Sequence, residues 1–162
     1  MEKLISDNLT ESLQQQLGHE KYNANLYLYV AGFLKNKGLN QLSKIFEDQH
    51  EEETQHSLMI YAVLTDLSAP VVIPEINEVN IPINSIMDIA NIYLQREIDT
   101  TNSLNEIKKL AIDEDNPVVE EYMRKMLVLQ QNEYAEATDF MDKAQLTGGD
   151  WMNVLIWDSG LK

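Results

Sequence analysis

The stretch Phe46–His56, which reads FEDQHEEETQH, places a carboxylate and an imidazole three residues apart, at Glu53 and His56. Side chains spaced by three and four residues share one face of an α-helix, and this face continues through the apolar residues Ile60 and Val63. A carboxylate at a core-facing position is costly unless it is paired or binds a cation. The stretch therefore predicts a helix that carries a metal-binding unit into a helical core.

Three further predicted helices each carry a face of apolar residues, spaced by three and four, that becomes polar only near its centre. Their central polar residues are Glu20, Glu97 and the pair Gln130 and Glu133. Each of them lies about 13 or 14 residues into its predicted helix, which is close to the middle of a helix roughly 40–45 Å long. Because a mid-helix residue stays near the middle of a bundle whichever way its helix runs, all of these groups are expected at one level.

Glycine and proline residues mark the ends of the predicted helices, which span about 6–36, 39–66, 84–112 and 117–146, with a short fifth helix at about 150–159. The turns near Gly38 and Pro117 are short, so each joins two antiparallel neighbours. The segment Leu67–Asn84 is long and proline-rich, as expected of a crossover. We therefore predict an all-α fold, a four-helix bundle of two antiparallel hairpins with one long crossover, within a single domain spanning 1–162.

The composition narrows the choice of partners. Lys and Arg number 12 against 27 Asp and Glu, a net charge of −15, which argues against nucleic acid or an anionic membrane surface. The chain has no cysteine, so any metal must be held by oxygen and imidazole nitrogen, and the imidazole favours iron, manganese or zinc. Residues 1–10 are polar and acidic, and no apolar run approaches the ~20 residues of a membrane helix. We expect a cytoplasmic protein.

The carboxylates and the imidazole favour two unequal metal positions. Glu-x-x-His is the repeated unit of di-iron carboxylate bundles, and here the second unit is replaced by Gln-x-x-Glu. Glu53 is the best candidate for a bridge between the two ions. Glu20 and His56 would complete one position, and Glu97 and Glu133 would complete a second, more weakly held one.

Other polar residues have two readings each. Tyr27, one turn of the stripe from Glu20, is either a hydrogen-bond partner or electron donor at the site or a core tyrosine. Gln130 either orients a water molecule or satisfies a neighbour. Glu52 faces away from the Glu53 stripe and is either an outlying cation site or a solvated charge. His19 and His50 are expected on surface or subunit-contact faces.

Nearly the whole chain resembles the ferritin family, and specifically its bacterial non-haem members. The resemblance rests on four segments: HEKYNANLYLY (19–29), FEDQHEEETQH (46–56), YLQREIDTTNSLNEI (93–107) and LVLQQNEYAEA (127–137). It implies that Glu20, Glu53, His56, Glu97 and Glu133 are iron ligands, that Gln130 is the glutamine of the site and that Tyr27 is the family's tyrosine beside it.

The same resemblance implies a ferroxidase that oxidises Fe2+ with O2 (or H2O2) at a di-iron centre. It also implies that the ferric oxide is stored in a homo-oligomeric shell of 24 subunits. The chain departs from the family at two points. Haem-containing members carry Glu-x-x-His where this chain has Gln130 and Glu133, so no haem is expected. A third iron position of the family would use Glu52 and Glu133 together with two further carboxylates of the fourth helix, but those two positions are Leu129 and Asn132.

Two competing hypotheses remain. The first is a di-iron or di-manganese oxidoreductase on the same bundle that stores no iron, and the lack of a second Glu-x-x-His counts against it. The second is a metal-free helical interaction module with hydrated carboxylates. The apolar tail Asp150–Lys162 is expected to be buried against other copies or to pack on its own bundle.

Overall fold

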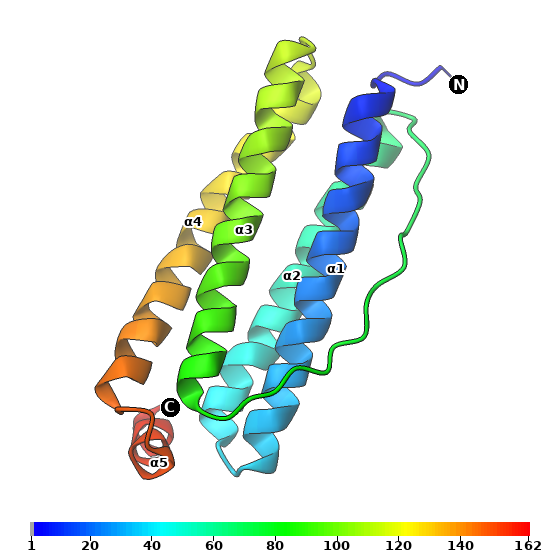
Figure 1. The fold of residues 1–162 in the computed structure, drawn as a ribbon. Helices are drawn as coiled ribbons and strands as arrows, with labels where there is room; N and C mark the ends of the chain where they lie inside the picture. The colour runs from blue at the N-terminus through cyan, green and yellow to red at the C-terminus, as the bar shows by residue number, and fades with distance from the viewer. Residues whose placement is uncertain (1) are drawn as a thin grey trace.

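Four long helices lie side by side, and a short fifth helix covers one end of the bundle (Figure 1). The computed structural model describes residues 2–162. The helices in this part of the chain are α1 (Asp7–Asn36), α2 (Asn40–Asp66), α3 (Ile86–Asp113), α4 (Pro117–Leu146) and α5 (Trp151–Gly160). Their ends lie within two residues of the predicted ones. The prediction of an all-α bundle of two hairpins and a crossover is confirmed.

Side chains before the helices satisfy the free amide groups of the first turns. Ser6 accepts a hydrogen bond from Leu9 N before α1, and Asn116 does the same for Val119 N before α4. The start of α2 has no such residue of its own. Instead, Oδ1 of Asp158 in α5 accepts a hydrogen bond of 2.8 Å from the amide of Leu42. The C-terminal helix thus caps the second helix.

The crossover between α2 and α3 runs along the outside of α1 for most of the length of the bundle (Figure 1). Gln14 of α1 donates a hydrogen bond of 2.7 Å to the carbonyl of Pro70, and Tyr29 donates one of 2.7 Å to the carbonyl of Ile81. Between these two bonds, Pro74 lies so close to Gly18 that an added Cβ atom would stand 2.5 Å from its Cγ. The crossover is therefore attached to the first hairpin and starts α3 at the end of the bundle where α2 began, so that α3 runs parallel to α2 (Figure 1).

The apolar core is divided into two clusters, one toward each end of the bundle. One contains an aromatic group in which Phe46 lies 5.2 Å from both Tyr93 and Phe140, measured between ring centroids. The other is aliphatic and includes Leu13, Ile60 and further residues of all four long helices. Buried polar residues occupy the layer between the clusters, which is the level that the sequence predicted for the central carboxylates.

The apolar tail packs on its own bundle with one face only. Val154 of α5 is fully buried, and Trp157 lies 4.9 Å from Phe140 between ring centroids. Met152, Leu155 and Ile156 on the other side of α5 remain exposed.

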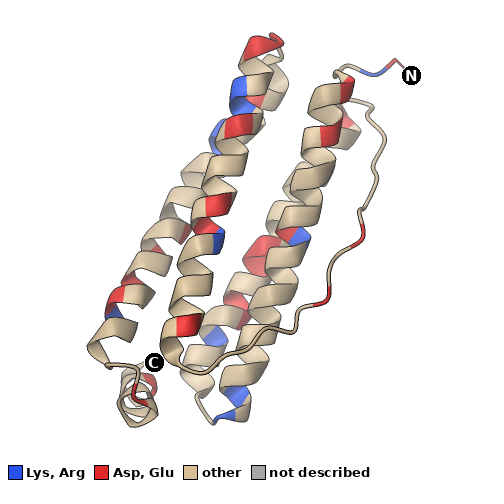
Figure 2. Cartoon of the chain, in the orientation of Figure 1, with Lys and Arg blue, Asp and Glu red and all other residues tan. Residues whose placement is uncertain are grey.

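Acidic residues lie along all the long helices (Figure 2). Within residues 2–162, no helix is long and apolar enough to cross a membrane.

Candidate metal centre

Each of the four long helices sends at least one carboxylate into the polar layer between the two apolar clusters. Glu20, Glu53 and Glu97 are fully buried, and Glu133 is 3% exposed. His56 is 7% exposed and lies one turn after Glu53 on α2. Each of these side chains lies on the apolar stripe of its helix. Because each stripe faces the other three helices, the polar side chains on it point into the interior of the bundle.

The first group of ligand atoms comes from α1 and α2. Glu20, Glu53 and His56 each offer one atom, and these atoms lie within 4.8 Å of one another. Nδ1 of His56 is 3.5 Å from Oε2 of Glu53 and 3.9 Å from Oε2 of Glu20. The three atoms surround a space in which one cation can touch all of them.

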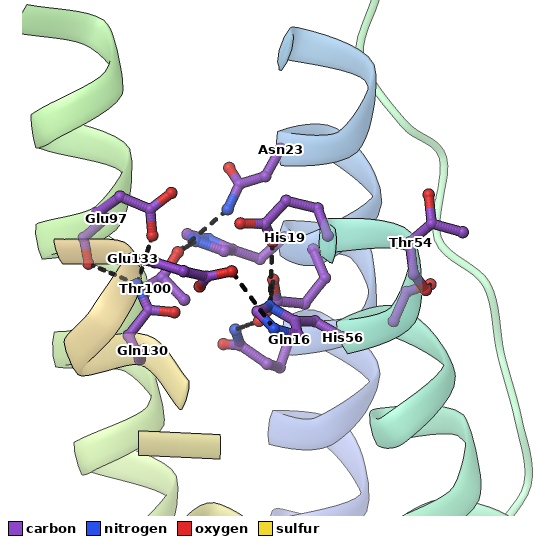
Figure 3. A network of polar contacts seen from close by, with 12 residues as sticks. Gln16, His19, Asn23, Thr54, His56, Glu97, Thr100, Gln130 and Glu133 are labelled. Carbon is purple, nitrogen blue, oxygen red and sulfur yellow. Dashed lines mark hydrogen bonds and ion pairs between the residues drawn. The ribbon is translucent and has the colours of Figure 1, made fainter. Parts of the chain in front are cut away.

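The second group comes from α2, α3 and α4 and shares a member with the first. Glu53, Glu97 and Glu133 also have ligand atoms within 4.8 Å of one another. Glu133 reaches from α4 toward His56, and its Oε1 lies 3.5 Å from Nε2 of that ring (Figure 3). Glu53 therefore lies between two adjacent groups, each able to hold a cation.

Neighbouring side chains hold two of the carboxylates in place. Gln16 donates a hydrogen bond of 2.8 Å to Oε1 of Glu20. Tyr27 donates one of 2.5 Å to Oε1 of Glu97. Gln130 donates one of 2.5 Å to Oε2 of the same carboxylate (Figure 3). These donors stabilise the charged form of each carboxylate and fix its direction.

The remaining ligand atoms have no hydrogen-bond partner within the described residues. They are Oε2 of Glu20, both carboxylate oxygens of Glu53, both of Glu133 and Nδ1 of His56. Each buried polar atom left in this state destabilises a protein by about 1–3 kcal/mol. Six such atoms at one level, all of ligand type, fit cations of the iron or manganese class.

The electrostatics of the site also favour a bound cation. Burial raises the pKa of Glu20 well above its ordinary value, and the charge of Glu53 raises it further. Burial likewise raises the pKa of Glu53 to about 8 and that of Glu133 to about 11. The carboxylates therefore retain protons near neutral pH, and a bound cation would have to displace them.

The structure places the other candidate residues in different surroundings. Tyr27 is fully buried beside Glu97, whereas Glu52 is exposed and belongs to neither group. His19 and His50 were expected on surface or subunit-contact faces; neither is fully exposed, and their part in subunit contacts stays a prediction. His19 is half-buried, with Nε2 2.8 Å from Oγ1 of Thr100, and Nδ1 of half-buried His50 lies 2.7 Å from a backbone carbonyl oxygen of α1.

The sequence analysis did not single out Gln16, Gln49 and Tyr93. Gln16 lies one turn before Glu20 on the same face of α1, so the helical spacing was an available signal for it. Burial raises the pKa of Tyr93 strongly, and the charge of Glu97 adds to this shift. No pattern in the sequence separates Tyr93 from an ordinary core tyrosine.

Comparisons with known proteins agree with this architecture. Residues 10–147 match the family described as the ferritin-like domain. The chain is 28% identical over 142 residues to ferritin BfrB of Mycolicibacterium smegmatis, covering 88% of this chain and 78% of the relative. It is 22% identical over 158 residues to a probable bacterial non-heme ferritin-like protein of Haemophilus influenzae, covering 98% and 96%.

Solved structures show the same fold. An open-pore ferritin from the archaeon Archaeoglobus fulgidus superimposes with a TM-score of 0.90 at 24% identity, over 96% of each chain. A ferritin of Chlorobium tepidum superimposes with a TM-score of 0.87 at 18% identity, covering 94% of this chain and 93% of that one.

Proposed function

This chain belongs to the family of ferritin-like domain proteins, and from that premise we propose that it stores iron and oxidises Fe2+ with O2 at a di-iron centre between its helices. The family and the fold support iron storage. The proposal goes beyond the family and the fold in three respects, which are the oxidation of Fe2+, the binding of two ions and the identity of the individual ligands. Fe2+ is here the substrate and the ferric oxide mineral is the stored product.

The observation that carries the proposal is the position of Glu53. It belongs both to the group with Glu20 and His56 and to the group with Glu97 and Glu133. Two divalent ions held close together repel each other, and a carboxylate between them lowers that repulsion. A shared carboxylate flanked by two buried ligand groups is what a pair of ions requires.

The charges of the site fit two ferrous ions. The carboxylates of Glu20, Glu53, Glu97 and Glu133 together supply four negative charges when ionised, and two Fe2+ ions supply four positive ones. Oxidation adds one positive charge to each ion, so the site gains an excess of two. Each Fe2+ gives one electron, and the pair can therefore reduce O2 by two electrons in one step.

The residues around the ligands have distinct proposed roles. Glu20 and His56 hold the first ion with Glu53, and Glu97 and Glu133 hold the second. Gln130 and Tyr27 are positioning residues that orient Glu97 through their hydrogen bonds. Nδ1 of His56 faces Glu20 and Glu53, so this is the nitrogen that would bind the first ion.

We also propose that the chain assembles into a shell of 24 subunits in the cytoplasm. Large apolar residues exposed on several helices support assembly, because extended apolar patches on a protein surface mark contacts with other chains. They include Leu28 on α1, Tyr61 on α2, Val128 on α4 and Ile156 on α5. Size-exclusion chromatography with light scattering measures the subunit number, and cell fractionation tests the location.

Aerobic titration with Fe2+ tests the proposed function. Stopped-flow absorbance is expected to show rapid oxidation of two Fe2+ per subunit, followed by slower growth of a mineral that elutes with the protein shell. A small oligomer that oxidises Fe2+ but retains only two ions per subunit would contradict storage. It would instead favour a di-iron oxidoreductase of the same fold. Absence of stoichiometric metal would contradict both functions.

A further inference from the structure

The interface between α1 and α3 is polar at the level of the metal centre, and it joins the two hairpins there (Figure 3). Nε2 of His19 lies 2.8 Å from Oγ1 of Thr100, and Nδ2 of Asn23 donates a hydrogen bond of 3.1 Å to the same oxygen. One turn further along α3, the hydroxyl of Ser103 donates a hydrogen bond to Oε1 of Gln16. Within residues 2–162, the contact from Ser103 is the one of these three that continues to a ligand of the metal centre.

Gln16 connects Ser103 to the first ligand group. Its side chain is 1% exposed, and its Nε2 donates a hydrogen bond of 2.8 Å to Oε1 of Glu20. One end of the amide thus bonds to α3, and the other end bonds to a carboxylate of the metal centre. Ser103, Gln16 and Glu20 therefore form a continuous chain of hydrogen bonds, which begins on the second hairpin and ends on a ligand from the first.

Ser103 determines which end of the Gln16 amide faces Glu20. A side-chain amide has a donor end and an acceptor end, and a rotation about its last bond exchanges the two. The hydroxyl of Ser103 bonds to the acceptor Oε1, so the donor Nε2 is directed at Glu20. Without this hydroxyl, Oε1 would lose its protein partner at a buried position, and the contact that favours this orientation would be gone.

The hydrogen bond from Gln16 leaves the other oxygen of Glu20 for an ion. Oε1 accepts that bond, whereas Oε2 is buried and has no hydrogen-bond partner within the described residues. Oε2 lies 3.9 Å from Nδ1 of His56, a separation that one cation can bridge. A rotation of the carboxylate would carry Oε2 away from the ring. The bond from Gln16 therefore sets the shape of the first ligand group.

We propose that Ser103 is a positioning residue of the metal centre, which orients Glu20 through the amide of Gln16 and so raises the affinity of the first ligand group for a divalent cation. The inference rests on the proposed function, because it takes Glu20 as a ligand of the first ion. The ligands of that group all come from α1 and α2. Ser103 gives α3 a part in the same position without contact with the ion.

Anaerobic calorimetric titration of the full chain with Fe2+ tests the proposal. Ser103→Ala removes the hydroxyl, and the first binding step is expected to weaken by about 10-fold, at the lower end of the effect of residues that support a metal ligand. The second step should not change. Ser103→Thr keeps the hydroxyl and should restore the first step. Its added methyl group has room, because Ser103 lines a cavity of about 350 Å3.

Thr100→Val is the matched control for this titration. It removes a buried hydroxyl from the same interface, and that hydroxyl bonds to His19 and Asn23 and to no ligand of the metal centre. Both binding steps are expected to stay unchanged. Equal weakening by Thr100→Val and Ser103→Ala would show a general loosening of the interface and would overturn the proposal.

A double-mutant cycle tests whether Ser103 acts through Gln16. Gln16→Leu removes the amide and keeps a side chain of similar size, so the first step should weaken at least as much as in Ser103→Ala. When both changes are combined, the loss should equal that of Gln16→Leu alone, because the hydroxyl then has no amide to orient. Losses that multiply in the double variant would overturn the proposed connection.

A crystal structure of Ser103→Ala without added metal separates this inference from the proposed function. The Gln16 amide is expected to turn away from Glu20, while the backbones of α1 and α3 stay in place. An unchanged bond between Gln16 and Glu20 would overturn the inference and leave the proposed function standing. A turned amide and a weakened first step in a chain that binds Fe2+ but does not oxidise it would support the inference and count against the ferroxidase. Absence of Fe2+ binding by the unaltered chain would overturn both.

Discussion

The hydroxyl of Tyr27 donates a hydrogen bond of 2.5 Å to Oε1 of Glu97, and both residues are fully buried. Gln130 donates to the other oxygen of the same carboxylate. Both bonds lower the pKa of Glu97 against the effect of burial, which raises it. Glu97 is therefore the ligand of the second group whose charged form is supported most directly by hydrogen bonds.

The variant Tyr27→Phe removes one of these bonds and leaves a ring of nearly the same shape. Loss of a hydrogen bond to a metal ligand typically weakens metal binding by about 10- to 100-fold. We expect this loss in the second step of anaerobic Fe2+ binding, measured by calorimetry, with the first step unchanged. Tyr29→Phe is the control, because the Tyr29 hydroxyl bonds to the crossover and not to the metal centre. Equal weakening of both steps would show a general structural effect.

The variant Glu53→Ala removes the carboxylate shared by both ligand groups. The initial rate of Fe2+ oxidation in stopped-flow absorbance is expected to fall by more than roughly 100-fold, because the effect should exceed that of losing a second-shell partner. The helices should still form, since a buried carboxylate without a partner does not stabilise the fold. Glu51→Ala, at an exposed position on the same helix, should oxidise iron at the normal rate. An unchanged rate for Glu53→Ala would remove this residue from the site.

The metal-free protein is expected to lose stability as the pH rises from about 5 to about 8. The pKa of Glu53 rises from an ordinary value of 4.5 to about 8 in the folded chain. In this window the folded state keeps a proton that the unfolded state releases, so higher pH favours unfolding. Thermal unfolding followed by circular dichroism measures the effect. Glu53→Gln, which cannot titrate, should show a weaker pH dependence, and an equal dependence would contradict the assignment.

Two glycines of α1 offer a matched pair of substitutions. Gly32→Ala places its methyl group where no other atom lies within 4 Å, and it should stabilise the helix by about 0.5–1 kcal/mol. Gly18→Ala makes the same change where Cγ of Pro74 would lie 2.5 Å from the new atom. We expect it to lower the unfolding temperature because the crossover must move away. A stabilised Gly18→Ala would show that the crossover is held loosely against α1.

Asp158 provides a test of the contact between the last helix and the start of α2. Asp158→Ala leaves the amide of Leu42 without an acceptor, and it should cost about 1–2 kcal/mol of unfolding free energy. Urea denaturation of the variant measures this loss. The control is Asp142→Ala, at an exposed position within α4, which is expected to change the unfolding free energy by less than about 0.5 kcal/mol.

The ends of the helices were predictable because the residues that stop them have strong local effects. Gly38 adopts a positive φ of 80° in the first turn, and Pro117 can begin a helix but not continue one. The common level of the four buried carboxylates was also predictable, because it follows from helical spacing and from their equal distances along the helices. These carboxylates belong to Glu20, Glu53, Glu97 and Glu133.

Helical spacing could not predict which individual atoms contact each other. His19 is held half-buried by Thr100, 81 residues away in the chain, and such a pairing depends on how the helices are rotated about their axes. Burial lowers the pKa of His19 to about 4 and the nearby charge of Arg96 adds to this shift, so the ring stays neutral well below neutral pH. The crossed cap from Asp158 to Leu42 was equally hidden, because it joins the end of the chain to its second helix.

The helices pack mainly within each hairpin, α1 against α2 and α3 against α4, and touch less between the hairpins. The second ligand group joins those two halves, since Glu53 comes from the first hairpin and Glu97 and Glu133 come from the other. An ion bound by this group would therefore hold the two hairpins together across the interface where they make fewer contacts. Iron-starved subunits should open along this interface more often than loaded ones, so the metal supply of the cell would set how rigid each subunit is.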